Sequence, residues 1–129
     1  FIQLSAVKAL LEYDRIVEEV RKVYKKRRDI MVKEFKKIGY EVDVPKATMY
    51  LWCKLPEIVT QKLGSLKFAE KLLVETGVAI SPGVGFGPNG EGYFRLALVT
   101  ADNRFHDAAL RFKKVFQELG VELKKKVKV

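Results

Sequence analysis

One arginine lies inside a stretch that otherwise predicts a buried β-strand. Residues 93–99 are apolar except for Arg95, and residues 78–81 form a shorter apolar strand before them. A two-residue period puts Arg95 on one face with Tyr93 and Ala97, and we expect both faces to be mostly buried. A buried guanidinium needs a counter-anion or hydrogen-bond acceptors. Its planar fork of donors is well suited to bidentate binding of a carboxylate.

From the residues alone, two interpretations of Arg95 stay open. It is either an anion-binding group or an arginine that extends to solvent at the sheet edge or pairs with Glu91. The loop between the two strands, residues 82–92, contains five glycines. Phosphate-binding loops place such glycines before the N-terminus of a helix, whereas here a strand follows. We therefore predict a loop that adjusts as a substrate enters, and no phosphate cradle.

The other reactive residue types do not cluster. Ser5 and Lys8 form a Ser-x-x-Lys pattern, but the partner motifs of a β-lactamase are missing and residues 9–11 continue a helix. The single histidine, His106, and the single cysteine, Cys53, provide no metal-ligand set, so we predict no metal site. One cysteine also allows no internal disulfide and favours a reducing, cytoplasmic compartment. No apolar run approaches the roughly 20 residues of a membrane helix.

Composition favours one globular domain. The chain has 129 residues, 48% of them hydrophobic, and a formal net charge of +9. Its basic residues are mixed with acidic ones along predicted helices, which indicates solvated faces more than a nucleic-acid surface. A free-standing basic module that binds RNA is an alternative, and it needs exposed aromatic residues on a sheet interleaved with Lys or Arg. A separate small-molecule regulatory domain is a third interpretation.

Two helices are predicted at the start of the chain. Residues 3–11 form a short helix with one buried stripe, made by Leu4, Val7, Leu10 and Leu11. A second helix begins at an Asp14 cap, ends at Gly39 and spans about 37 Å. Its opposite face is basic and solvated, and includes Glu34. Its buried stripe comprises Ile16, Val20, Val23, Tyr24, Met31, Phe35 and Ile38.

The remaining segments predict the sheet and its covering helices. Residues 40–44 form a short extended piece, residues 49–55 form a strand with Tyr50, Trp52 and Cys53 in the core, and residues 57–64 form a loop. Ser65 caps a helix over 66–76, which ends at Gly77 and buries Phe68, Ala69, Leu72 and Leu73. Thr100 or Asp102 caps the last helix, which ends at Gly120 and buries Phe105, Ala108, Ala109, Phe112, Val115, Phe116 and Leu119. Residues 121–129 form a frayed edge strand or are disordered.

This order predicts a two-layer α+β fold: a three-stranded core sheet covered by helices on one face and preceded by a long helix. The last two strands are expected to be antiparallel neighbours, because one loop joins them.

Two motifs resemble the class I/II, fold-type I pyridoxal-phosphate aminotransferases. PGVGFG at 82–87, a short glycine-rich loop and YFRL at 93–96 look like the C-terminal signature of that family. PKATMYLW at 45–52 is similar to its P-x-G-x-Φ-Y-x-W pattern, with Ala47 where many members have glycine. The sequence of residues 90–99 is most similar to the alanine, aspartate and LL-diaminopimelate aminotransferase branch.

The resemblance implies a C-terminal small domain at 14–129, preceded at 1–13 by the end of the large-domain helix region, with the long helix between the domains. It implies that Arg95 binds the α-carboxylate of amino acid and 2-oxo acid substrates. Pyridoxal 5'-phosphate and its Schiff-base lysine would belong to a large domain outside this chain, as would the other cofactor-binding residues. We therefore expect no catalytic, cofactor-binding or metal residue here, an inactive isolated chain, and a homodimer for the whole enzyme.

Overall fold

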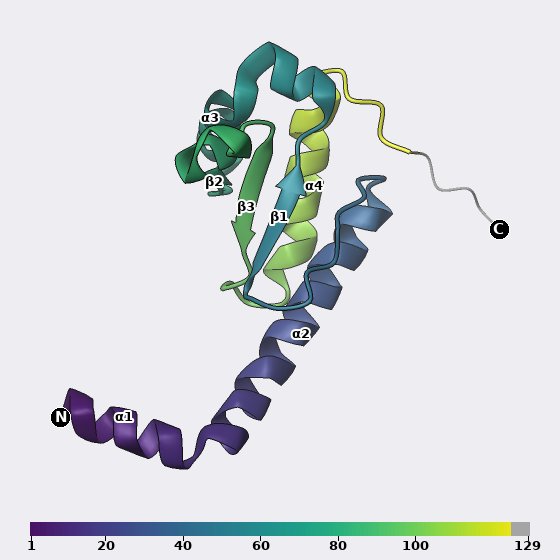
Figure 1. The fold of residues 1–129 in the computed structure, drawn as a ribbon. Helices are drawn as coiled ribbons and strands as arrows, with labels where there is room; N and C mark the ends of the chain where they lie inside the picture. Colours follow the sequence, from purple (N-terminus) through teal and green to yellow (C-terminus); the bar gives the residue numbers. More distant parts are fainter. Residues whose placement is uncertain (125–129) are drawn as a thin grey trace.

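The computed structural model describes residues 1–124 and has the predicted α+β architecture (Figure 1). In chain order the elements are α1 (Ile2–Leu11), α2 (Tyr13–Lys37), β1 (Tyr50–Lys54), α3 (Glu57–Thr76), β2 (Ser81–Pro82), the 3-10 turns η1 (Gly83–Phe86) and η2 (Pro88–Gly90), β3 (Tyr93–Ala97) and α4 (Arg104–Glu118). None of the helices within residues 1–124 combines the length and apolar character needed to cross a membrane.

The three strands form one antiparallel sheet in the order β1-β3-β2. The prediction that the last two strands are antiparallel neighbours is confirmed. Arg95 on the central strand β3 lies opposite Trp52 of β1 on one side and Ser81 of β2 on the other. β2 is only two residues long, shorter than the predicted strand over 78–81. Arg95 is therefore in the middle of the sheet and away from its edge.

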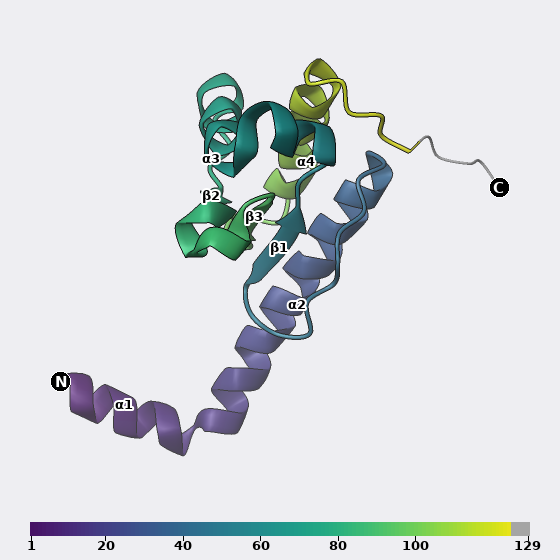
Figure 2. The ribbon, with the colours of Figure 1, turned by 45° about the horizontal axis from the view of Figure 1, so that its top comes forward.

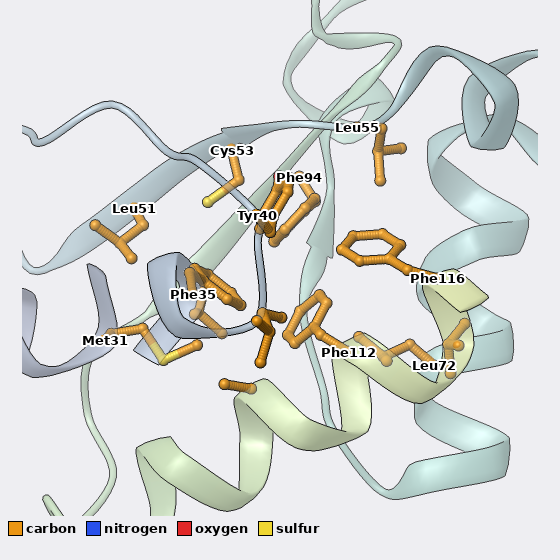
Figure 3. Close-up of a cluster of buried hydrophobic side chains, with 14 of the residues drawn as sticks. Met31, Phe35, Tyr40, Leu51, Cys53, Leu55, Leu72, Phe94, Phe112 and Phe116 are labelled. Carbon is orange, nitrogen blue, oxygen red and sulfur yellow. The ribbon is translucent and has the colours of Figure 1, made fainter. Parts of the chain in front are cut away.

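A single aromatic core holds the sheet against α2, α3 and α4 (Figure 3). Phe94 of β3 lies 5.3 Å from Phe112 of α4 and 6.0 Å from Phe68 of α3, measured between ring centroids. Phe35 of α2 meets Phe112 edge-on at 5.2 Å. One continuous set of ring contacts thus joins three helices and the central strand, which is why the inward face of the sheet is buried.

The apolar stripe of the long helix is buried only over its second half. Met31 and Phe35 are fully covered, whereas Val20 and Val23 are nearly half exposed, because the first half of α2 extends beyond the sheet and its covering helices (Figure 2). α1 buries none of its residues, so the predicted burial of its apolar stripe is wrong. Leu10, for example, is 73% exposed. A hydrophobic stripe predicts a surface that suits burial, and these two segments have no partner within residues 1–124.

Residues 57–63 are helical, and the prediction of a loop over 57–64 is wrong except at Gly64. The carbonyl of Pro56 accepts hydrogen bonds from the amides of Val59 and Thr60, so α3 begins directly after the proline. At Gly64 the backbone has φ 69° and ψ 176°, outside the helical region, so the helix is interrupted there and restarts at Ser65. Glycine adopts this left-handed region without the steric cost of a Cβ. The second half buries Phe68 as predicted, but Leu73 is half exposed.

The predicted helix ends are confirmed at all three glycines, since α2, α3 and α4 end just before Gly39, Gly77 and Gly120. The predicted side-chain caps are wrong. Neither α2 nor α4 has a side-chain cap hydrogen bond. Asp102 instead pairs with Lys26 of α2 at 2.8 Å, and this lysine holds the pKa of the Asp102 carboxyl below its ordinary value.

Two predicted extended segments, residues 40–44 and the chain end, lie side by side where they are described. Residues 40–44 and 121–124 belong to no strand, and the amide of Lys124 donates to the carbonyl of Gly39 at 3.3 Å. The predicted edge strand or disorder at 121–129 concerns mostly residues 125–129, which lie outside the described part.

Candidate functional site

The candidate site is the face of the sheet that points away from the aromatic core. Four side chains of β1 and β3 lie on it, Tyr50, Trp52, Tyr93 and Arg95, and we call this surface the open face. All four are partly accessible, and Trp52 is 40% exposed. The sequence-based prediction that both faces of β3 are buried, and that Trp52 belongs to the core, is therefore wrong. Cys53 on the inward face is buried as predicted.

Arg95 lies against two aromatic rings. Its guanidinium carbon is 4.2 Å from the ring centroid of Tyr50 and 4.5 Å from that of Phe86. Tyr50 comes from the neighbouring strand, diagonal to Arg95, whereas Phe86 comes from the glycine-rich loop. Contacts of a guanidinium with aromatic faces are electrostatically favourable and strengthen as water is excluded. The two rings therefore hold the charged end of Arg95 in one region of the open face.

The hydrogen-bonding capacity of Arg95 is largely unused within residues 1–124. One guanidinium nitrogen donates to Ser81 Oγ at a long 3.4 Å, and no carboxylate among these residues pairs with it. The alternative pairing with Glu91 is wrong, because that carboxylate binds Ser65 and Gly92 instead. A guanidinium has five N–H donors in a fixed fork. Most of these donors remain available to an anion that approaches the open face.

Trp52 and Tyr93 complete an aromatic wall beside Arg95. Their rings are stacked at 5.6 Å between centroids, with 14° between planes. Phe86 meets Trp52 edge-on at 5.5 Å and 80°. A charged group beside such a wall is partly shielded from water, so its attraction for an opposite charge is stronger than on an open surface. The arrangement can bind a small carboxylate and pack its apolar part against the rings.

The comparison with known proteins decides the family. A sequence model of the family described as Aminotransferase class I and II matches residues 1–109. The chain belongs to the class I and II aminotransferase family.

Individual relatives agree with this assignment. The chain is 46% identical over 113 residues to the putative aminotransferase AatC of Rhizobium meliloti, which covers 88% of this chain and 28% of the relative. It is 40% identical over 120 residues to the glutamate-pyruvate aminotransferase AlaC of Escherichia coli, covering 93% and 29%. The aromatic aminotransferase of Pyrococcus horikoshii has a similar structure, with a TM-score of 0.70 and 36% identity over 81% of this chain and 27% of that one. The chain thus spans less than a third of the length of these relatives.

The glycine-rich loop of this aminotransferase-family chain folds into the turns η1 and η2. The second half of α3 restarts at Ser65, and its first amide is occupied by Glu91, whose Oε1 accepts from the Ser65 N–H at 2.7 Å. The amides of Ser65 and Gly92 lower the pKa of Glu91, so the carboxylate stays ionised at neutral pH. An anion already fills this helix N-terminus, and the predicted Ser65 cap is replaced by a residue 26 positions away.

The remaining predicted candidates lie apart from the open face. Lys8 is exposed on α1 and pairs with Glu12 at 2.5 Å. His106 of α4 donates from Nδ1 to Glu34 of α2 at 2.8 Å, and Glu34 is only 7% exposed, so its predicted place on a solvated face is wrong. Within residues 1–124 no group of three His, Cys, Asp or Glu side chains has the arrangement of a metal site.

Sequence reasoning singled out Arg95 but missed the residues that surround it. Phe86 was assigned no role, although its ring contacts both Arg95 and Trp52. Tyr50 was placed in the core. The only available signal was the two-residue period of β1, which puts Tyr50 and Trp52 on the same face.

Proposed function

We propose that this chain is the small domain of a pyridoxal-phosphate-dependent aminotransferase and that Arg95 binds the substrate α-carboxylate. The observation that carries the proposal is the state of Arg95. Its guanidinium is half-buried on the central strand, lies over two aromatic rings, and has no carboxylate partner within residues 1–124. Family membership supports the reaction class, since the relatives are named aminotransferases.

Arg95 would serve both halves of a transamination. An amino acid and a 2-oxo acid each carry a carboxylate next to the reacting carbon, so one bidentate grip orients either molecule. Two parallel hydrogen bonds from a guanidinium fix both the plane and the direction of the carboxylate. Correct orientation of the reacting atom contributes a large part of the rate acceleration by an enzyme. Arg95 is thus a substrate-binding residue that touches the substrate beside the reacting carbon.

The described residues do not fit a pyridoxal-phosphate site. Lys8 is exposed and paired with Glu12, and the helix N-terminus at Ser65 already holds the Glu91 carboxylate. We therefore propose that the cofactor, which provides the carbanion chemistry of this family, is bound by a large domain outside this chain. In that arrangement residues 1–13 are the end of the large-domain helix region and residues 14–129 the small domain. The exposed apolar residues of α1 support it, since they need a partner.

Substitution of Arg95 in the full-length protein tests the proposal. The amino donors are L-alanine, L-aspartate, L-glutamate, L-phenylalanine and LL-diaminopimelate, each with pyruvate and 2-oxoglutarate. Arg95→Gln should lower kcat/KM for the best donor by about 100-fold or more, because a desolvated carboxylate loses its charged partner. Arg95→Lys should lower it less, since a point charge replaces the fork.

Arg104→Lys is the matched control, because Arg104 is exposed at the start of α4. It should leave kcat/KM unchanged. Full turnover by Arg95→Gln would remove the role assigned to Arg95. Absence of transamination by the wild-type protein with every donor and acceptor would contradict the enzyme class.

A further inference from the structure

Phe86 has an unusual environment for a large apolar residue. It is 50% exposed and lies on a loop between Gly85 and Gly87, where a Cβ added to either glycine would meet no atom within 4 Å. Burial therefore does not explain its position. Its ring nevertheless lies over the guanidinium of Arg95 and meets Trp52 edge-on. The contacts that Phe86 makes point to a role beside Arg95.

The loop that carries Phe86 is closed at its base. A Cβ on Gly83 would lie 2.0 Å from the carbonyl oxygen of Gly90, so the two backbones touch with no space for a side chain. Residues 84–89 lie between these two glycines. This contact fixes where the loop starts and ends, and Phe86 lies between the two ends.

A buried serine ties both ends of the loop to α3. Ser65 is fully buried, and its Oγ accepts a hydrogen bond from the amide of Val84 at 3.2 Å. The same hydroxyl donates to Glu91 Oε2 at 3.0 Å, while Glu91 Oε1 accepts from the amides of Ser65 and Gly92. A hydrogen-bonded buried hydroxyl is costly to lose, because its partners are left unsatisfied. We call this set of bonds the Ser65–Glu91 anchor.

We propose that Phe86 is a positioning residue for Arg95 and that the Ser65–Glu91 anchor sets where its ring lies. Tyr50 reaches Arg95 from a paired strand, so its place is fixed by the sheet. Phe86 reaches it from a loop, so its place depends on the anchor. Two rings restrict the rotamers of Arg95 before a ligand arrives, which lowers the entropy lost on binding. The inference rests on the proposed function, because it assumes that Arg95 binds a carboxylate.

Binding of propionate to the full-length, cofactor-loaded protein tests the inference, with propionamide as the uncharged control. Calorimetry should give a Kd for propionate that rises about 2- to 5-fold in Phe86→Leu, the size expected for one half-exposed cation–π contact. Phe86→Tyr should restore the wild-type Kd, because it keeps the aromatic face. Ser65→Ala should raise the Kd in the same direction, and the effects of Ser65→Ala and Phe86→Leu should be less than additive, since both act on one ring.

Asn89→Ala is the matched loop control, because Asn89 is exposed in η2 and its side chain makes no hydrogen bond among the described residues. It should bind propionate as the wild type does. With the best amino donor, Phe86→Leu should raise KM about 2- to 5-fold and leave kcat within about 2-fold. A general loss of structure would lower kcat as well.

The outcomes separate the two proposals. If Arg95→Gln abolishes propionate binding while Phe86→Leu binds as the wild type does, the positioning role is wrong and the carboxylate site stands. If propionate binding survives Arg95→Gln, the carboxylate site itself is wrong, and the role of Phe86 falls with it.

Discussion

Replacing Glu34 by glutamine tests a buried carboxylate that joins α2 to α4. Glu34 is 7% exposed and lies in the second half of α2. Its carboxylate accepts a hydrogen bond from His106 Nδ1 at 2.8 Å and another from Lys37. Glu34→Gln keeps the shape of the side chain, removes its charge and replaces one of its two acceptor oxygens by an NH2 donor. The change therefore removes the charge together with one of the two hydrogen bonds that Glu34 accepts.

The expected loss lies between two limits. A hydrogen bond to a charged group contributes about 1.5–3 kcal/mol, whereas an exposed ion pair contributes about 0.2–1 kcal/mol. The carboxylate is covered, but the His106 side chain is 59% exposed, and Lys37 also lies at the surface. We therefore expect Glu34→Gln to lower the free energy of unfolding by about 1–2 kcal/mol at pH 7.

The pH dependence has a definite sign. The hydrogen bond from His106, and then the one from Lys37, hold the pKa of Glu34 below its ordinary value. A carboxyl group whose pKa is lowered by folding stabilises the folded state fully above the ordinary value of about 4.3, and this stabilisation is lost as the pH falls through the lowered value. The difference in free energy of unfolding between wild type and Glu34→Gln should thus have its full size at pH 7 and shrink below about pH 4.

The difference in free energy of unfolding is measured by urea unfolding of the 129-residue chain. The unfolding is monitored by circular dichroism and by the fluorescence of Trp52, the only tryptophan. Coincidence of the two transitions is the check that unfolding is two-state. Glu41→Gln is the matched control, because Glu41 pairs with Lys124 through exposed side chains. Equal stability of Glu34→Gln and Glu41→Gln at pH 7, or a difference that persists unchanged at pH 3, would refute the reasoning.

Two further predictions concern the loop and the core. Gly83→Ala should lower the free energy of unfolding by about 1–3 kcal/mol or more through overpacking against Gly90, and it should alter the near-ultraviolet circular dichroism of Trp52. Gly85→Ala should do neither, because the space around Gly85 is open. Equal effects of the two changes would contradict the close contact of Gly83 with Gly90. Burial raises the pKa of the Cys53 thiol to about 12. Iodoacetamide at pH 8 should therefore label Cys53 only after unfolding in urea, with labelling measured by mass spectrometry. Rapid labelling of the folded chain would show that the thiol is accessible and contradict the prediction.

The parts of the fold that depend on local pattern were predicted from the sequence. The apolar period of α4, the alternation along β3 and the glycines that end three helices each report on one element alone. Such signals arise because the backbone period decides which side chains share a face. The same alternation put Arg95 on a strand, and the motifs around it supplied the family resemblance that the family match bears out.

Contacts between distant residues were decided only by the tertiary structure. The Glu91 carboxylate caps the second half of α3 from 26 residues away, and the Phe86 ring reaches Arg95 from a loop. No local period encodes either contact, because each depends on where separate elements meet. Residues 57–63 are a related case: Val59 before the kink at Gly64 and Phe68 after it both lie in the one core cluster.

Exposure was the other property that the sequence by itself left undetermined. An apolar stripe indicates that a face is suitable for burial, but whether it is buried depends on a partner surface. In residues 1–124 the stripe of α4 has the core as its partner, and that of α1 has none. The two-residue period of β1 likewise puts Trp52 and Cys53 on opposite faces of the sheet. Only the arrangement of the helices decided that Trp52 lies beside Arg95 and that Cys53 lies in the core.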